Sequence, residues 1–166
     1  MPENERRELD NMEDWESMMH FAIQLIIESE RYKGTGIWGE RIIILHLDHA
    51  NEMLMKSFFI KKGYIINYLE KEELKKGVKK EDILDKDKTM EYVDCLKLIC
   101  NKLVNGFSED KTKKIIKFHK LRNEIQHRAI NLGLNKGEEI ELFYPFFKEL
   151  YILMFPEYAD AFPKIF

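Results

Sequence analysis

Apolar residues recur at helical spacing along most of this chain, and this periodicity limits the folds open to it. Near the N-terminus they follow one another at alternating intervals of three and one, the pattern of one buried stripe on an amphipathic helix. Only 4 prolines and 8 glycines occur in 166 residues, too few for the many turns of an all-β fold. The sequence therefore predicts an all-α fold, a bundle of four to five main helices. The N-terminal stripe comprises Trp15, Met18, Met19, Ala22, Ile23, Ile26 and Ile27.

Capping residues and glycines set the expected ends of these helices. Ser108 is the expected N-cap of the fifth segment, and Gly63 the expected C-cap of the second. We expect Pro145 to kink the last segment, and the aromatic tail after Pro156 to pack on the bundle. The expected helical segments are residues 11–33, 39–62, 89–104, 109–132 and 137–154, with a short helix at 65–69 in the charged connection after the second.

The length fits one domain with its own hydrophobic core, and we expect residues 1–166 to form it. Cys95 and Cys100 lie in a helical pattern at a spacing that points them in different directions, so we expect buried free thiols in a reducing compartment. Neither a secretory signal nor an apolar run long enough for a membrane span is present in the sequence. We therefore expect a cytoplasmic protein without a membrane partner.

Charge is distributed unevenly along the chain. The formal net charge of −3 argues against a protein that coats nucleic acid by bulk attraction. Residues 101–130, however, hold eight basic residues against three acidic ones, and a polyanion would bind there. Charge alone fits an ordinary solvated helix face better, although both interpretations stay open.

The fifth helical segment divides into three faces when its residues are projected at about 100° each. One face is apolar and would pack on the core, and a second is charged and would meet water. The third carries only hydrogen-bonding side chains, which predicts either a functional groove or residues that satisfy one another between helices. The apolar face comprises Phe118, Leu121, Ile125, Ala129 and Leu132; the charged face Lys117, Lys120, Glu124 and Arg128; the polar face His119, Arg122, Asn123, Gln126 and His127.

The polar face has the chemistry that cleavage of a phosphodiester requires. Arginine is a permanent cation whose planar group matches a phosphate, and histidine moves protons near neutral pH. Together they could bind the phosphate, stabilise the transition state and assist attack by a neighbouring 2′-hydroxyl. Such a reaction needs no metal or other cofactor. A metal site at His46, His49 and Glu52 fits poorly, because the spacing carries Glu52 off the face of His46.

Residues 118–128, FHKLRNEIQHR, resemble the Arg-Asn-x-x-x-His signature, a form of Arg-x4-6-His, of HEPN domains. These all-α domains occur in prokaryotic toxins, phage-defence proteins and CRISPR-associated ribonucleases. Residues 47–58, LDHANEMLMKSF, are similar to the Ala-x-Glu-x-Leu-x-Lys-Ala helix of the same superfamily. The chain departs at Ala129, where toxins paired with nucleotidyltransferase antitoxins carry a tyrosine, so inactivation through that tyrosine is not expected.

The resemblance implies a metal-independent endoribonuclease, acting on RNA as a toxin or as a phage-defence (abortive infection) effector. It also implies a homodimer with a shared groove, and it suggests an antitoxin or regulatory protein as a partner. Arg122 would bind and polarise the phosphate, His127 would transfer a proton or orient the 2′-hydroxyl, and Asn123 would support the site. We predict that the remaining substrate contacts come from His119, Gln126, Lys120 and Arg128.

Two other interpretations remain open. The chain could be a non-catalytic HEPN-like module whose groove binds RNA or a nucleotide, or serves assembly. It could also be a helical scaffold in which Arg122 and His127 are structural. Polar faces that meet across an open groove in a dimer would favour an enzyme or a binding module, whereas burial of the polar face inside one chain would favour the scaffold.

Overall fold

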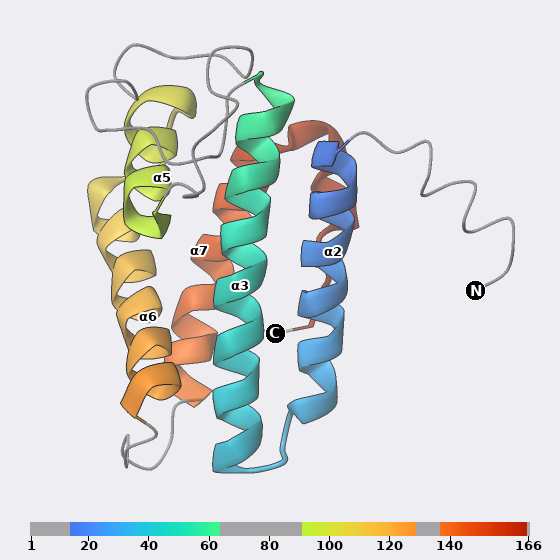
Figure 1. The fold of residues 1–166 in the computed structure, drawn as a ribbon, viewed down its shortest axis with the longest axis vertical. Helices are drawn as coiled ribbons and strands as arrows, with labels where there is room; N and C mark the ends of the chain where they lie inside the picture. The colour runs from blue at the N-terminus through green and yellow to red at the C-terminus, as the bar shows by residue number, and fades with distance from the viewer. Residues whose placement is uncertain (1–13, 64–90, 129–136, 166) are drawn as a thin grey trace, which may run out of the picture.

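The computed structural model describes residues 14–63, 91–128 and 137–165, which form helices and short connections without a β-strand. The prediction of an all-α fold is therefore confirmed. None of the described helices combines the length and the apolar character that a membrane-spanning helix requires. The α-helices are α2 (Asp14–Ser29), α3 (Ile37–Lys61), α5 (Tyr92–Leu98), α6 (Glu109–Arg128) and α7 (Gly137–Met154), with 3-10 turns η1 (Glu30–Tyr32) and η4 (Pro156–Ala161) and a π-helical segment η3 (Ile99–Leu103) (Figure 1).

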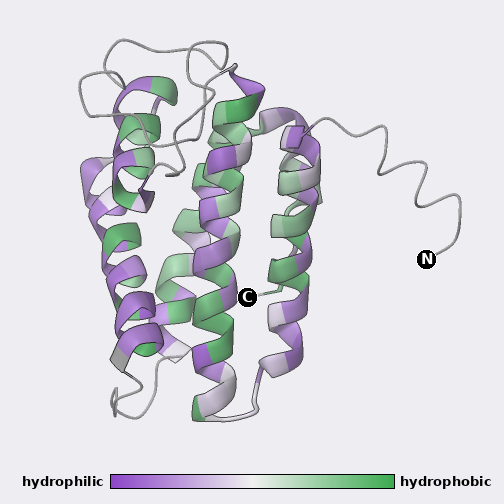
Figure 2. Ribbon diagram, viewed as in Figure 1, coloured by the Kyte–Doolittle hydropathy of each residue, from purple (hydrophilic) through white to green (hydrophobic). Residues whose placement is uncertain are grey.

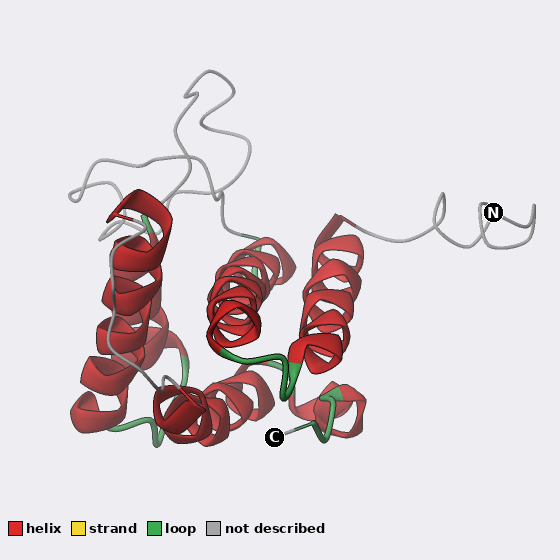
Figure 3. Cartoon of the chain, turned by 90° about the horizontal axis from the view of Figure 1, so that it is seen from below, coloured by secondary structure: helices red, strands yellow, loops and turns green. Residues whose placement is uncertain are grey.

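The longest of these helices, α3, is the centre of the bundle. It contacts α2, α5, α6 and α7, and the views from the side and from below both place it between α2 and α6 (Figures 1 and 3). Hydrophobic residues gather where the helices face one another (Figure 2). The core is continuous across the described helices, and its largest fully buried side chains include Leu47, Phe58, Phe147 and Tyr151.

Most of the expected helix ends agree with the structure. Helix α7 has the predicted bounds, and it continues through Pro145, which lies inside it. Gly63 follows α3 with a φ of 79°, as a C-cap glycine should, and α3 begins two residues earlier than expected, at Ile37. Ser108 caps α6, because its Oγ accepts a hydrogen bond from the backbone N–H of Lys111 at 3.3 Å. The expectations for residues 11–13, 65–69, 89–90 and 129–133 lie outside the described residues.

The third expected helix differs in its second half. We predicted a regular helix to Val104, whereas the α-helix ends at Leu98 and a π-helical turn follows, in which Val104 N–H bonds to Ile99 O at 3.0 Å. Both cysteines in this region are buried free thiols, as predicted. The aromatic tail also packs as predicted, with Phe162 2 % exposed.

Candidate functional site

Helix α6 presents its polar face in two directions. Ile115 and Phe118 anchor the helix in the core. His119, Arg122 and Asn123 are partly buried on the side toward α3, whereas Gln126 and His127 are exposed. The structure therefore splits the polar face that the projection treated as one groove. Lys120 is exposed to solvent, and the side chain of Arg128 is not among those that the structure describes.

Asp48 on α3 is the centre of the buried half of the polar face. Its side chain is completely buried, and its Oδ2 lies 2.9 Å from His119 Nδ1 and 3.5 Å from Arg122 Nε. A carboxylate without water needs partners that offset its desolvation, and here a guanidinium and an imidazole N–H do so. Asp48 thereby ties the middle of α3 to the middle of α6.

Asn123 closes the network from the other side. Its Oδ1 accepts a hydrogen bond from Arg122 Nη1 at 2.9 Å, which directs its Nδ2 toward His119 Nε2 at 3.2 Å. The amide can donate to Nε2 only if that nitrogen carries no proton, so the pattern uses a neutral imidazole that donates from Nδ1 to Asp48. In this arrangement Asp48 and Arg122 are the charged members and offset one another.

Helix α5 contributes an aromatic wall to the same cluster. The Tyr92 ring stacks on the His119 ring with centroids 3.8 Å apart and an angle of 8° between planes. Asn51 Nδ2, on α3, donates a hydrogen bond to the Tyr92 hydroxyl at 2.5 Å. Burial and the neighbouring Asp48 carboxylate raise the pKa of the Tyr92 phenol well above its ordinary value. Tyr92 is thus a neutral packing and hydrogen-bonding group that fixes the plane of the imidazole.

Arg122 lies at the edge of this cluster rather than inside it. Its side chain is 22 % exposed, although its Nε is buried and has no hydrogen-bond partner among the described residues. Among the described residues, one of its five N–H groups donates a hydrogen bond, from Nη1 to Asn123 Oδ1. The arrangement holds a guanidinium in place while leaving part of its donor capacity open to a ligand.

No protein-family model, curated protein or solved structure matches this chain. The geometry of the described residues therefore carries the argument for a site.

Three members of the cluster were not predicted as site residues: Asp48, Asn51 and Tyr92. Two of them had a signal in the sequence, because Asp48 and Asn51 fall within the buried stripe of α3 that runs through Ile44, Leu47 and Leu54. Polar residues at apolar positions of a helix indicate buried partners. Tyr92 had no such signal, because an aromatic residue in a helical stripe is an ordinary core residue.

The basic character of α6 is smaller in the structure than in the sequence. Four of its lysines form ion pairs, Lys113 with Glu109, Lys114 with Asp110, Lys111 with Glu149 and Lys117 with Glu139, at 2.5–3.2 Å. Lys120 forms no ion pair within the described part of the chain. Among the described side chains of α6, Lys120 is therefore the lysine without an ion pair, and it lies two residues before Arg122.

The three residues considered as a metal site have separate partners. His46 packs edge-on against Tyr32, His49 against Phe21, and Glu52 pairs with Lys56 at 2.6 Å. Burial lowers the pKa of His46. Among the described residues no group of three His, Cys, Asp or Glu side chains is arranged to hold a metal ion. The cysteines have no nucleophilic character either, because burial raises the pKa of Cys100 to about 11 and that of Cys95 further.

Proposed function

We propose that this protein is a metal-independent endoribonuclease of the HEPN type, in which Arg122 and His127 act on the scissile phosphodiester of an RNA. The observation that carries the proposal is the fixed position of the Arg122 guanidinium, held by Asp48 and Asn123 at the edge of a buried network. A cation that is oriented before substrate binds stabilises developing charge without reorganisation. Asn123 has the supporting role that the resemblance implies.

In the proposed reaction, His127 takes the proton from a ribose 2′-hydroxyl. The 2′-oxygen attacks phosphorus, the bond from phosphorus to the 5′-oxygen breaks, and the leaving oxygen takes a proton from water, giving a 2′,3′-cyclic phosphate and a free 5′-hydroxyl. Arg122 offsets the additional negative charge of the five-coordinate transition state through its unused N–H groups. The exposure of His127 suits a group that must reach an external substrate.

Arg122 and His127 are about 140° apart around α6 and about 7.5 Å apart along it, an awkward offset for one site on one helix. A homodimer removes this difficulty, because two α6 helices related by a two-fold axis can each supply one residue to a shared groove. We propose such a dimer, with a biological role as a toxin or phage-defence effector and with regulation by a partner protein.

The test is cleavage of total RNA by the purified chain in the presence of EDTA. We expect Arg122→Ala and His127→Ala to lower the rate at least about 100-fold each. Matched controls are Arg31→Ala and His20→Ala, which remove exposed side chains of the same types from the α2 side of the bundle. Circular dichroism and gel filtration would confirm that all variants keep the fold and oligomeric state of the wild type.

A second candidate function is favoured by the way in which His119, Arg122 and Asn123 satisfy one another around Asp48. The chain would then be a non-catalytic module. If no variant cuts RNA but Arg122→Ala weakens RNA binding, the function is binding. If neither cleavage nor binding depends on Arg122 and His127, the network serves only the fold.

A further inference from the structure

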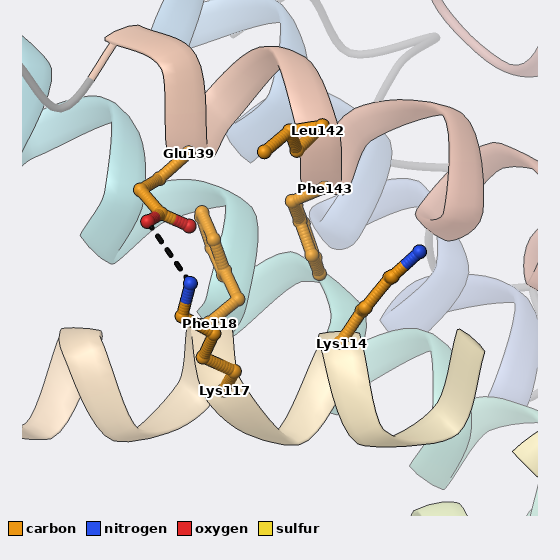
Figure 4. Close-up of a pocket in the computed structure, with 6 residues that line it drawn as sticks. All are labelled: Lys114, Lys117, Phe118, Glu139, Leu142 and Phe143. Atoms are coloured by element: carbon orange, nitrogen blue, oxygen red, sulfur yellow. Dashed lines mark hydrogen bonds and ion pairs between the residues drawn. The ribbon is translucent and has the colours of Figure 1, made fainter. Parts of the chain in front are cut away.

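A groove runs between α6 and α7, on the opposite side of α6 from Asp48. It consists of two adjoining hollows of about 200 and 270 Å³ that share Lys117 and Glu139. Its floor is apolar and is built by Phe118, Phe143 and Leu142 (Figure 4). Leu142 is 60 % exposed, so its side chain is open to a ligand.

The rim of the groove carries both lysines and carboxylates. Lys114, Lys117 and Lys120 stand along the α6 side together with Glu124, and Glu139 faces Lys117 from α7. Glu139 Oε1 pairs with Lys117 at 3.2 Å, and its second oxygen accepts no hydrogen bond within the described residues. The Lys117 side chain is 71 % exposed, so this pair is weak and a ligand can displace or share it.

We propose that this groove binds a base of single-stranded RNA and that Glu139 makes it selective for guanine. The inference rests on the proposed function and names its substrate more closely. A flat base would lie against the apolar floor, and the lysines of α6 would contact the flanking phosphates. The carboxylate then accepts hydrogen bonds from the edge of the base.

Guanine is the base that suits a carboxylate, which only accepts hydrogen bonds. Its Watson–Crick edge presents two neighbouring donors, the imino N1–H and the exocyclic amino group. Adenine and cytosine place an acceptor nitrogen beside their amino group, and uracil places a carbonyl on each side of its imino group. Each of these three would set a lone pair against the carboxylate, which disfavours it.

The groove also leads toward the proposed catalytic residues. Lys120, Glu124 and His127 follow one another at spacings of four and three, so they lie along one side of α6. Lys120 and Glu124 line the second hollow, about two turns and one turn before His127 respectively. A strand with its base in the groove would therefore run past Lys120 and bring a neighbouring phosphodiester toward His127 of the same chain.

The test is binding of short single-stranded 2′-O-methyl oligonucleotides, in which no 2′-hydroxyl remains to attack. One probe carries a single central guanosine in an adenosine tract, a second has inosine at that position, and a third has adenosine throughout. We expect the wild-type chain to bind the guanosine probe about tenfold more tightly than the adenosine probe, with inosine between. Fluorescence anisotropy would measure the dissociation constants.

Glu139→Gln should remove this preference, whereas Glu141→Gln, an exposed carboxylate on α7 that does not line the groove, should leave it unchanged. Leu142→Ala should weaken binding of all three probes alike and keep the preference. Equal binding of the three probes by the wild type, a preference that survives Glu139→Gln, or no binding at all would each overturn the inference. RNA cleavage with no guanosine preference in binding would support the proposed function and overturn this inference. Guanosine-selective binding without RNA cleavage would support this inference and contradict the proposed ribonuclease activity.

Discussion

Asp48 shows at the scale of a single residue how the network depends on charge. Its carboxylate is fully buried, and Oδ1 has no hydrogen-bond partner among the described residues, so Oδ2 alone meets His119 and Arg122. An ionised group in this position is tolerated only because a counter-charge lies beside it. The stability of the folded protein and the orientation of the Arg122 side chain therefore both depend on Oδ2 of Asp48.

Asp48→Asn tests this dependence, because it removes the charge and keeps the shape. We expect the free energy of unfolding to fall by about 2–3 kcal/mol, since Arg122 keeps a partly buried charge with no counter-ion. Urea denaturation would measure the change. Asp160→Asn, an exposed carboxylate in η4, is the matched control and should stay within about 0.5 kcal/mol of the wild type. Equal effects of the two substitutions would mean that Asp48 is not the counter-charge of Arg122.

The Asp48 network also shows what sequence can reveal about a site. Arg122, Asn123 and His127 were found because they share one helix at a recognisable spacing. Asp48 lies 71 residues away from His119 along the chain, and its partner could not be named until the packing of α3 on α6 was known. We did not predict that Asp48 and Asn51 are buried, although both fall at apolar positions of α3, and that spacing would not have named the groups they contact.

At the start of α3, close contact with the end of η1 restricts which residue can occupy position 39. Gly39 is buried in the first turn, directly against the Tyr32 carbonyl at the end of η1. A Cβ at this position would lie 2.4 Å from Tyr32 O and 1.9 Å from Thr35 Oγ1, which donates a hydrogen bond to the same carbonyl. The close approach of α2 and α3 at this end therefore requires glycine.

Gly39→Ala should destabilise the protein, against the usual trend for a helix. Alanine normally gains about 1 kcal/mol over glycine in a helix, but overlap with a backbone carbonyl costs more, and we expect a net loss of about 1–2 kcal/mol. Thermal and urea unfolding would measure it. The double variant Thr35→Ala/Gly39→Ala should recover part of the loss, with Thr35→Ala alone as its reference. A Gly39→Ala chain more stable than the wild type would show that the turn relaxes freely.

The ends of helices could be predicted from the sequence where a proline or a glycine terminates the helix. Helix α7 ends before Pro156 and α3 ends before Gly63, and both ends were predicted. The π-helical turn after Leu98 was not, because its hydrogen bond from Val104 to Ile99 leaves no characteristic residue pattern. Whether the chain continues after Leu98 as an α-helix or as a π-helix depends on how α5 packs against its neighbours, and that packing could not be predicted from the sequence.

At the scale of the whole molecule, the offset between Arg122 and His127 decides how many chains one site needs. Two residues about 140° apart on a helix cannot both face one point in front of it. In the proposed dimer, Arg122 of one chain and His127 of the other would form each of two equivalent sites. The network around Asp48 supports this arrangement because it fixes Arg122 on one side of α6 and leaves His127 exposed on another.

Mixing two inactive variants tests this shared site directly. Arg122→Ala and His127→Ala chains, denatured together and refolded, should form mixed dimers as about half of the population by random pairing. Each mixed dimer would have one site with both Arg122 and His127 and one site with neither. About a quarter of the wild-type RNA cleavage should therefore return, and each variant refolded alone is the control. If every site were built within one chain, the mixture would stay as inactive as its parts, because no chain in it carries both residues.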